Sequence, residues 1–131
     1  MERKWIAIAA ITGLVAVGLG AFGAHGLKDR IEPDQLAAFE VGVRYQMYHA
    51  LALLGVAWVM ARHPSRAASA AGASMLLGVL LFSGSLYGLS LTPWRWLGPI
   101  TPIGGLLLMV GWALLAVAVM QGKKSKPVDT A

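Results

Sequence analysis

Four long apolar stretches set the strongest limit on what this chain can fold into. Each has about the 20 residues that an α-helix needs to cross a hydrocarbon core of about 30 Å. They are apolar on all sides, whereas the helices of a soluble bundle keep one polar face. The stretches comprise residues 5–24, 41–61, 67–91 and 103–120. The pattern predicts an all-α integral membrane protein, built as a four-helix bundle from a single domain.

Helix-start signals sharpen the expected boundaries. Pro33 fits the first position of a helix, and Ser65 is a typical N-cap. Thr92 and Thr101 each precede a proline, which predicts two further N-caps. We expect one membrane domain over residues 1–122, with spans at about 5–25, 35–61, 66–91 and 102–121, followed by a polar basic tail at 123–131.

The basic residues indicate how the chain is inserted. Short loops on the cytoplasmic side of a membrane are rich in lysine and arginine. Most of the 11 basic side chains flank the expected spans on one side, so we expect both termini in the cytoplasm. The net charge of +5 is therefore a signal of topology and not of nucleic-acid binding. The residues on that side are Arg3, Lys4, Arg62, Arg66, Lys123, Lys124 and Lys126.

The segment GLGAFGAHG, at residues 18–26, contains the G-x-G-x-x-G spacing of dinucleotide-binding loops. That fingerprint requires a preceding strand, a following helix and an acidic residue about 20 positions further on. Here a membrane helix precedes the glycines and a charged loop follows them, which excludes nucleotide binding. Small residues spaced four apart instead predict close contacts between helices, either within one chain or between two chains. These are Ala16, Gly20 and Ala24, and the pair Gly84 and Gly88.

Polar side chains gather in the half of the membrane opposite the basic loops. Counting about 1.5 Å per residue back from Ala61 places Arg44 about 25 Å, and His49 about 18 Å, above the cytoplasmic boundary. Glu40 is spaced to pair with Arg44 on one helix face, as is Tyr45 with His49. Groups buried in lipid must find partners inside the protein, so we expect one outer polar network. Its members are His25, Glu40, Arg44, Tyr45, Tyr48, His49, Ser83, Ser85 and Tyr87.

Two interpretations of this network stay open. In the first, it lines a cavity that binds a small polar or lipidic ligand. In the second, the network only fixes helix packing, and the protein is a structural module or one that binds a protein partner, which can be a second copy of itself. Transport is a weaker alternative, because the cytoplasmic half offers no polar path.

The sequence does not favour an enzyme. The chain has no cysteine, which excludes disulfides and cysteine-based metal or redox sites. We see no cluster with metal-ligand spacing and no nucleophile with an evident base. We therefore expect a non-enzymatic protein with no catalytic site, metal or other cofactor, and with the lipid bilayer as its surroundings.

Several segments resemble the signature of one family. LGAFGAHGL, YQMYHALALLG, LFSGSLYGL and TPIGG occur in that order and cover all four expected spans. Together they resemble the domain-of-unknown-function 423 family of small bacterial inner-membrane proteins, to which the animal transmembrane protein 256 group is similar. The resemblance implies a four-helix domain in the bacterial cytoplasmic membrane. It carries over no catalytic or binding residue.

The expected topology is testable with reporters fused after residue 131. Because both termini are expected in the cytoplasm, a fused green fluorescent protein should fluoresce and a fused alkaline phosphatase should stay inactive. The two activities are measured in intact cells. An active phosphatase fusion would contradict the orientation and the depths assigned to Arg44 and His49.

Overall fold

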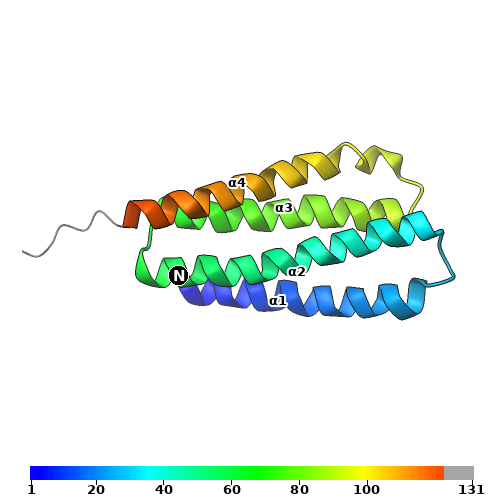
Figure 1. Ribbon diagram of the computed structural model, residues 1–131, viewed down its shortest axis with the longest axis horizontal. Helices are drawn as coiled ribbons and strands as arrows, with labels where there is room; N and C mark the ends of the chain where they lie inside the picture. Colours follow the sequence, from blue (N-terminus) through cyan, green and yellow to red (C-terminus); the bar gives the residue numbers. More distant parts are fainter. Residues whose placement is uncertain (123–131) are drawn as a thin grey trace, which may run out of the picture.

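The computed structural model describes residues 1–122 and folds them into four long helices (Figure 1). A π-helical turn at Gly23–Leu27 extends the first helix, and a 3-10 turn at Arg95–Leu97 precedes the last. The expected tail at 123–131 lies outside the described residues. The helices are α1 (Glu2–Phe22), α2 (Pro33–Arg62), α3 (Arg66–Leu91) and α4 (Ile100–Gln121). The prediction of an all-α fold with four helices is confirmed.

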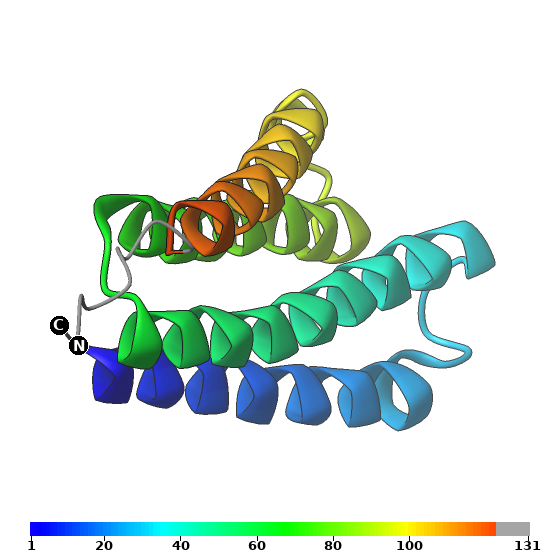
Figure 2. The same ribbon diagram turned by 60° about the vertical axis from the view of Figure 1, so that its left-hand side comes forward.

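The four helices stand in a row in chain order, each antiparallel to the one before it. Both views show α1 against α2, α2 against α3, and α3 against α4 (Figures 1 and 2). The start of α1 and the end of α4 lie at the same end of the row. Arg3, Arg62 and Arg66 therefore share one end of the molecule, in keeping with their expected position on one side of a membrane.

Three of the four helical segments are long and apolar enough to cross a membrane by themselves. They are Glu2–Leu27, Arg66–Leu91 and Arg95–Gln121. Helix α2 is not among them, because polar residues such as Arg44, Gln46 and His49 fall inside its apolar stretch. It nevertheless runs between α1 and α3 over their length. A bilayer that both neighbours cross must also hold α2, so its crossing stays a prediction that the packing supports.

Local signals in the sequence explain where the helices begin. At the start of α2, the side chain of Gln35 accepts a hydrogen bond of 3.1 Å from the backbone N–H of Glu32, half of a capping box. At the start of α3, Ser65 Oγ accepts one of 3.1 Å from Ala68. The expected N-cap at Thr101 is wrong: α4 begins at Ile100, and the Thr101 hydroxyl bonds a side chain of α3 instead.

Thr92 does accept a hydrogen bond from the backbone N–H of Trp94, at 3.3 Å, but the turn that follows is only three residues long. Its hydroxyl also donates to the carbonyl of Gly88, 2.6 Å away, at the end of α3. Thr92 thus closes one helix as much as it opens the next turn.

The apolar core lies toward the basic end of the row. Leu53, Val56 and Met75 are fully enclosed between α2 and α3. The indole of Trp5 reaches across from α1, where only a glycine, Gly72, leaves room for it on α3. The outward faces of α1 and α4 carry large exposed aliphatic side chains, as helices surrounded by lipid do.

Glycines set the contact between α3 and α4. An ideal Cβ on Gly104 would lie 2.8 Å from Cα of Phe82, and one on Gly78 would lie 2.9 Å from the backbone nitrogen of Leu108. Within this chain, Gly84 and Gly88 make no close helix contact: Gly84 meets nothing within 4 Å and Gly88 meets only the side chain of Leu97. The small residues that bring the backbones of α3 and α4 together are Gly78 and Gly104.

The predicted row on α1 is partly confirmed. Ala16 is buried, and an ideal Cβ on Gly20 would lie 3.3 Å from Val43 on α2. Gly23, one turn further, faces the ring of Phe39 just as closely. Ala24 is exposed and takes no part. Gly20 and Gly23 of the GLGAFGAHG segment thus pack against α2, whereas Gly18 has open space around it.

The α3–α4 contact yields a stability prediction. Gly104→Ala places a methyl group against the backbone of Phe82, so we expect a loss of about 1–3 kcal/mol in the free energy of unfolding. Gly18→Ala is the matched control, since Gly18 has open space around it and should change stability by less than about 1 kcal/mol. Thermal unfolding in detergent measures both. Equal unfolding temperatures for the two variants would refute the backbone contact.

Candidate functional site

The predicted polar residues do not form one outer network. His25, Glu40, Arg44, Tyr45 and Tyr48 are exposed on the surface of the helices. Only His49, Ser83 and Ser85 are buried, and Tyr87 is half-buried. The buried members divide between two sides of α2, and on each side they bond to residues that the prediction did not include.

The first network joins three helices through the buried amide of Gln46. Its Nε2 donates to the backbone carbonyl of Thr12 on α1, at 3.0 Å. The hydroxyl of Tyr87 on α3 donates to its Oε1, at 2.6 Å. One turn away, Ser83 Oγ donates to the carbonyl of Gly42 on α2, at 2.6 Å. α2 is thus tied to both neighbours at the same level.

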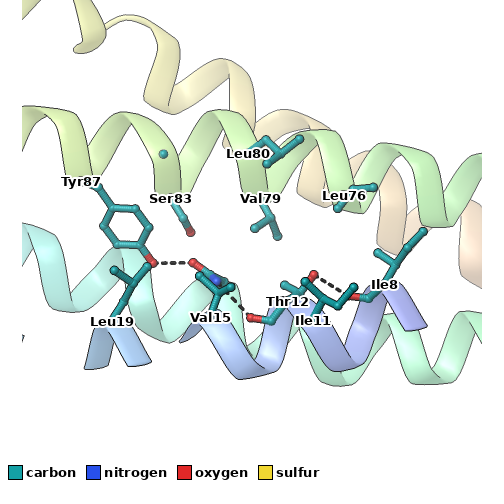
Figure 3. A pocket seen from close by; sticks show the side chains of 12 residues that line it. Ile8, Ile11, Thr12, Val15, Leu19, Leu76, Val79, Leu80, Ser83 and Tyr87 are labelled. Atoms are coloured by element: carbon teal, nitrogen blue, oxygen red, sulfur yellow. Dashed lines mark hydrogen bonds between the residues drawn. The ribbon is translucent and has the colours of Figure 1, made fainter. Parts of the chain in front are cut away.

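These polar groups form the floor of a groove between α1 and α3 (Figure 3). The groove has a volume of about 510 Å³, and aliphatic side chains of both helices make its walls. Gly84 leaves the α3 wall open, since an ideal Cβ there meets nothing within 4 Å. The wall residues are Ile8, Ile11, Val15, Leu19, Leu76, Val79 and Leu80. Among the described residues, no charged side chain lines this groove.

The second network centres on His49, on the side of α2 that faces α4. The indole N–H of Trp112 donates to His49 Nε2, at 3.1 Å. The other ring nitrogen, Nδ1, lies 2.7 Å from the carbonyl oxygen of Tyr45. A carbonyl only accepts, so Nδ1 carries the proton and Nε2 is left as the acceptor. These two bonds therefore hold His49 as a neutral imidazole in one tautomer, with both nitrogens occupied.

Aromatic rings and a hydroxyl pair complete this side. The ring of Tyr45 stacks on His49 and packs 4.9 Å from the ring of Phe82, centre to centre. Ser85 on α3 donates to the carbonyl of Phe82 and lies 2.5 Å from the hydroxyl of Thr101 on α4. Because Ser85 has a single hydroxyl proton, Thr101 is the donor in that pair.

Each enclosed polar side-chain atom within residues 1–122 has a hydrogen-bond partner. In a membrane such groups have no water to bond, so this completeness is what stability demands of them. The networks connect α1 with α2, α2 with α3, α2 with α4, and α3 with α4. The same hydrogen bonds that make up the candidate site therefore also hold the helices together.

The expected pair of Glu40 and Arg44 is not formed. Within the described residues, the one ion pair joins the N-terminal amine to Glu2. Among the residues of α2 that are turned toward neighbouring helices are Phe39, Gln46 and Leu53, spaced seven apart. Arg44 is two residues from Gln46 and so points the opposite way. His25, in the π-helical turn, is likewise exposed.

Sequence reasoning missed Gln46, Trp112 and Thr101 as members of the networks. A signal existed for Gln46, because it shares the seven-residue spacing of its buried neighbours Phe39 and Leu53. Trp112 has no such signal, since its partner lies 63 residues away in the chain. Among the described residues, no group of three His, Cys, Asp or Glu side chains could hold a metal ion.

Together the apolar helices and their internal polar links define a small helical membrane protein. The chain belongs to the DUF423 family, since the family model described as "Protein of unknown function (DUF423)" matches residues 19–105. The family resemblance seen in the sequence is thereby confirmed.

Relatives occur in bacteria and in fission yeast. The chain is 45% identical to the UPF0382 membrane protein YwdK of Bacillus subtilis, over 91% of this chain and 98% of the relative. It is 41% identical to a UPF0382 membrane protein of Haemophilus influenzae, over 94% and 98%. A UPF0382 membrane protein of Schizosaccharomyces pombe is 44% identical, over 84% and 96%. No solved structure matches the chain.

The role of Gln46 can be measured with a double-mutant cycle. Gln46→Leu leaves the Tyr87 hydroxyl without its acceptor, and Tyr87→Phe removes the donor while keeping the ring. Hydrogen bonds between membrane helices contribute about 0.5–2 kcal/mol, so we expect each single variant to lose that much and the double variant to lose less than the sum. Unfolding in detergent gives the free energies. Strict additivity would contradict the link.

Proposed function

We propose that this protein binds a lipidic amphiphile with an uncharged polar group in the groove between α1 and α3. The observation that carries the proposal is the combination of an apolar wall on both sides with a hydrogen-bonding floor at Gln46, Ser83 and Tyr87. The ligand-binding interpretation of the sequence is thus kept, but at a different place and without Arg44, His49 or His25.

The shape of the groove favours a hydrocarbon chain. Its wall on α1 runs from Ile8 to Leu19, which is about 17 Å along the helix axis. Half of a hydrocarbon core of about 30 Å is about 15 Å, so one acyl or isoprenoid chain of a single leaflet matches the groove in length. The volume of about 510 Å³ also lies within the range of ligand pockets.

The floor favours a hydroxyl or similar neutral group on that chain. Gln46 uses one of its two amide protons on Thr12, so one proton is free to donate to a ligand. The hydroxyl proton of Tyr87 is already donated to Gln46, which leaves the Tyr87 oxygen as an acceptor, while Ser83 is fully enclosed beneath it. A ligand hydroxyl both donates and accepts, and so fits this set. A phosphate would find no charged partner in the groove.

A structural role for the polar side chains is the second candidate, and the His49 network favours it. Both ring nitrogens of His49 are bonded within the protein, and its side chain is 4% exposed. On that side of α2, the bond between His49 and Trp112 fixes α4 against the rest of the row and occupies the polar atoms of both side chains. The two interpretations drawn from the sequence therefore apply to different sides of one helix.

The setting of this activity is also part of the proposal. We infer four crossings of the bacterial cytoplasmic membrane with both termini inside, on the basis of the basic residues at one end of the row. We infer a binding protein and not an enzyme, because the groove pairs its hydroxyls with acceptors and places no base beside them.

The test uses two photoactivatable lipids that carry the same diazirine-labelled acyl chain. One is a diacylglycerol, with a free hydroxyl, and the other a phosphatidylcholine. In liposomes containing the full chain, the diacylglycerol should label the α1 and α3 walls, and peptide mass spectrometry locates the label. Gly84→Leu fills the groove and should reduce this labelling several-fold, whereas Gly18→Leu, outside the groove, should not.

Two results would contradict the proposal. One is labelling spread evenly over other lipid-facing residues such as Leu106 and Met109 of α4, which would mean ordinary lipid contact. The other is labelling of the groove that Gly84→Leu leaves unchanged.

A further inference from the structure

The face of α2 opposite the groove carries two charges at membrane depth. Six residues spaced three or four apart form one stripe along this face, which we call the outer stripe. Its large side chains are well exposed, with Tyr48 at 51% and Leu51 at 60%. The outer stripe consists of Glu40, Arg44, Tyr48, Leu51, Gly55 and Trp58.

The packing against α3 fixes the depth of these charges. Ser83 bonds the carbonyl of Gly42, two residues before Arg44. Ser83 lies eight residues before the end of the apolar helix α3, which is about 12 Å inside that end. The backbone of Arg44 is therefore deeper still. Ionisable side chains at membrane depth nearly always face a protein interior or pair with one another.

Arg44 and Glu40 do neither within the single chain. Both are exposed, and the structure records no ion pair between them although they are one turn apart. The two charges are opposite and sit on one face, so the stripe is complementary to itself. A second copy of the same face would give each charged side chain a partner of opposite charge.

We propose that two copies of this chain associate through the outer stripe of α2. Copies inserted in the same direction are related by a two-fold axis along the membrane normal, which sets the two α2 helices side by side and parallel. Each residue then lies near its own counterpart, and Glu40 of one copy comes within about one turn of the partner's Arg44. The symmetry forms this ion pair twice.

The rest of the stripe fits the same arrangement. An ideal Cβ on Gly55 meets nothing within 4 Å, so a small residue leaves room there for the backbone of a neighbouring helix. At the basic end, the Arg62 guanidinium lies 4.6 Å above the centre of the Trp58 ring, within its own chain.

The inference is tested by cysteine crosslinking of the full chain in membranes. The natural sequence has no cysteine, so each engineered thiol is the only one present. Leu51→Cys and Gly55→Cys lie on the outer stripe, and Leu14→Cys on α1 and Leu106→Cys on α4 are exposed controls. With a short bismaleimide, we expect the stripe variants to give a band of two chains at several times the yield of the controls.

Charge reversal in the Gly55→Cys background tests complementarity. Glu40→Arg and Arg44→Glu should each lower the crosslinked fraction several-fold, because like charges then face each other. The double variant restores opposite charges and should recover the fraction. The groove variant Gly84→Leu should leave crosslinking unchanged, so dimerisation and ligand binding fail or hold independently.

Three outcomes would overturn the inference. Stripe cysteines that crosslink no better than the controls would show that lipid covers this face. A crosslinked band that is not two copies in mass would show that another protein does. A crosslinked fraction that neither charge reversal changes would show that the Arg44 side chain contacts lipid headgroups and not a partner chain. If a charge-reversed variant fails to accumulate, the cysteine comparison with natural charges decides alone.

Discussion

The amide of Gln46 is the interaction on which the arrangement of the first three helices depends. A single buried side chain accepts from α3 and donates to α1, and so fixes the height of both helices relative to α2. Apolar packing alone lets membrane helices slide, because lipid is as apolar as the side chains. A group that must be hydrogen-bonded allows one register only. Gln46 also lies on the floor of the groove between α1 and α3 and links the two helices there.

Contact with α4 is achieved by a different means. At Gly78, Gly104 and Gly111, α3 and α4 meet backbone to backbone, with no room for a Cβ. Helix α1 is separated from α3 by the width of α2 along most of its length and touches it through Trp5 at the basic end. The contact between α3 and α4 is therefore tight, whereas α1 and α3 leave between them the groove in which we propose that a ligand binds.

The sequence predicted the fold well and the site poorly, for a physical reason. Helix number and class follow from apolar length and cap residues such as Ser65, which are local properties of the chain. The site depends on which face of α2 is turned inward, and the sequence offers two polar candidates, Gln46 and Arg44, on opposite sides. The charge of Arg44 favoured placing it inside the bundle, whereas the structure encloses Gln46 and leaves Arg44 exposed. The spacing of Phe39, Gln46 and Leu53 shows which face of α2 is buried. The links to Trp112 and Thr101 can be predicted only when the α3–α4 contact is known.

The need of every buried polar group for a hydrogen-bond partner explains why one face of α2 is buried and the other exposed. A neutral amide is satisfied by two ordinary hydrogen bonds, so Gln46 can be enclosed within one chain. A guanidinium has five donors and a full charge, and a carboxylate is its natural partner. The row of helices encloses no site of that kind, so Glu40 and Arg44 face outward from the structure. A two-fold pairing supplies each of them with its opposite and leaves the groove of each copy facing the lipid.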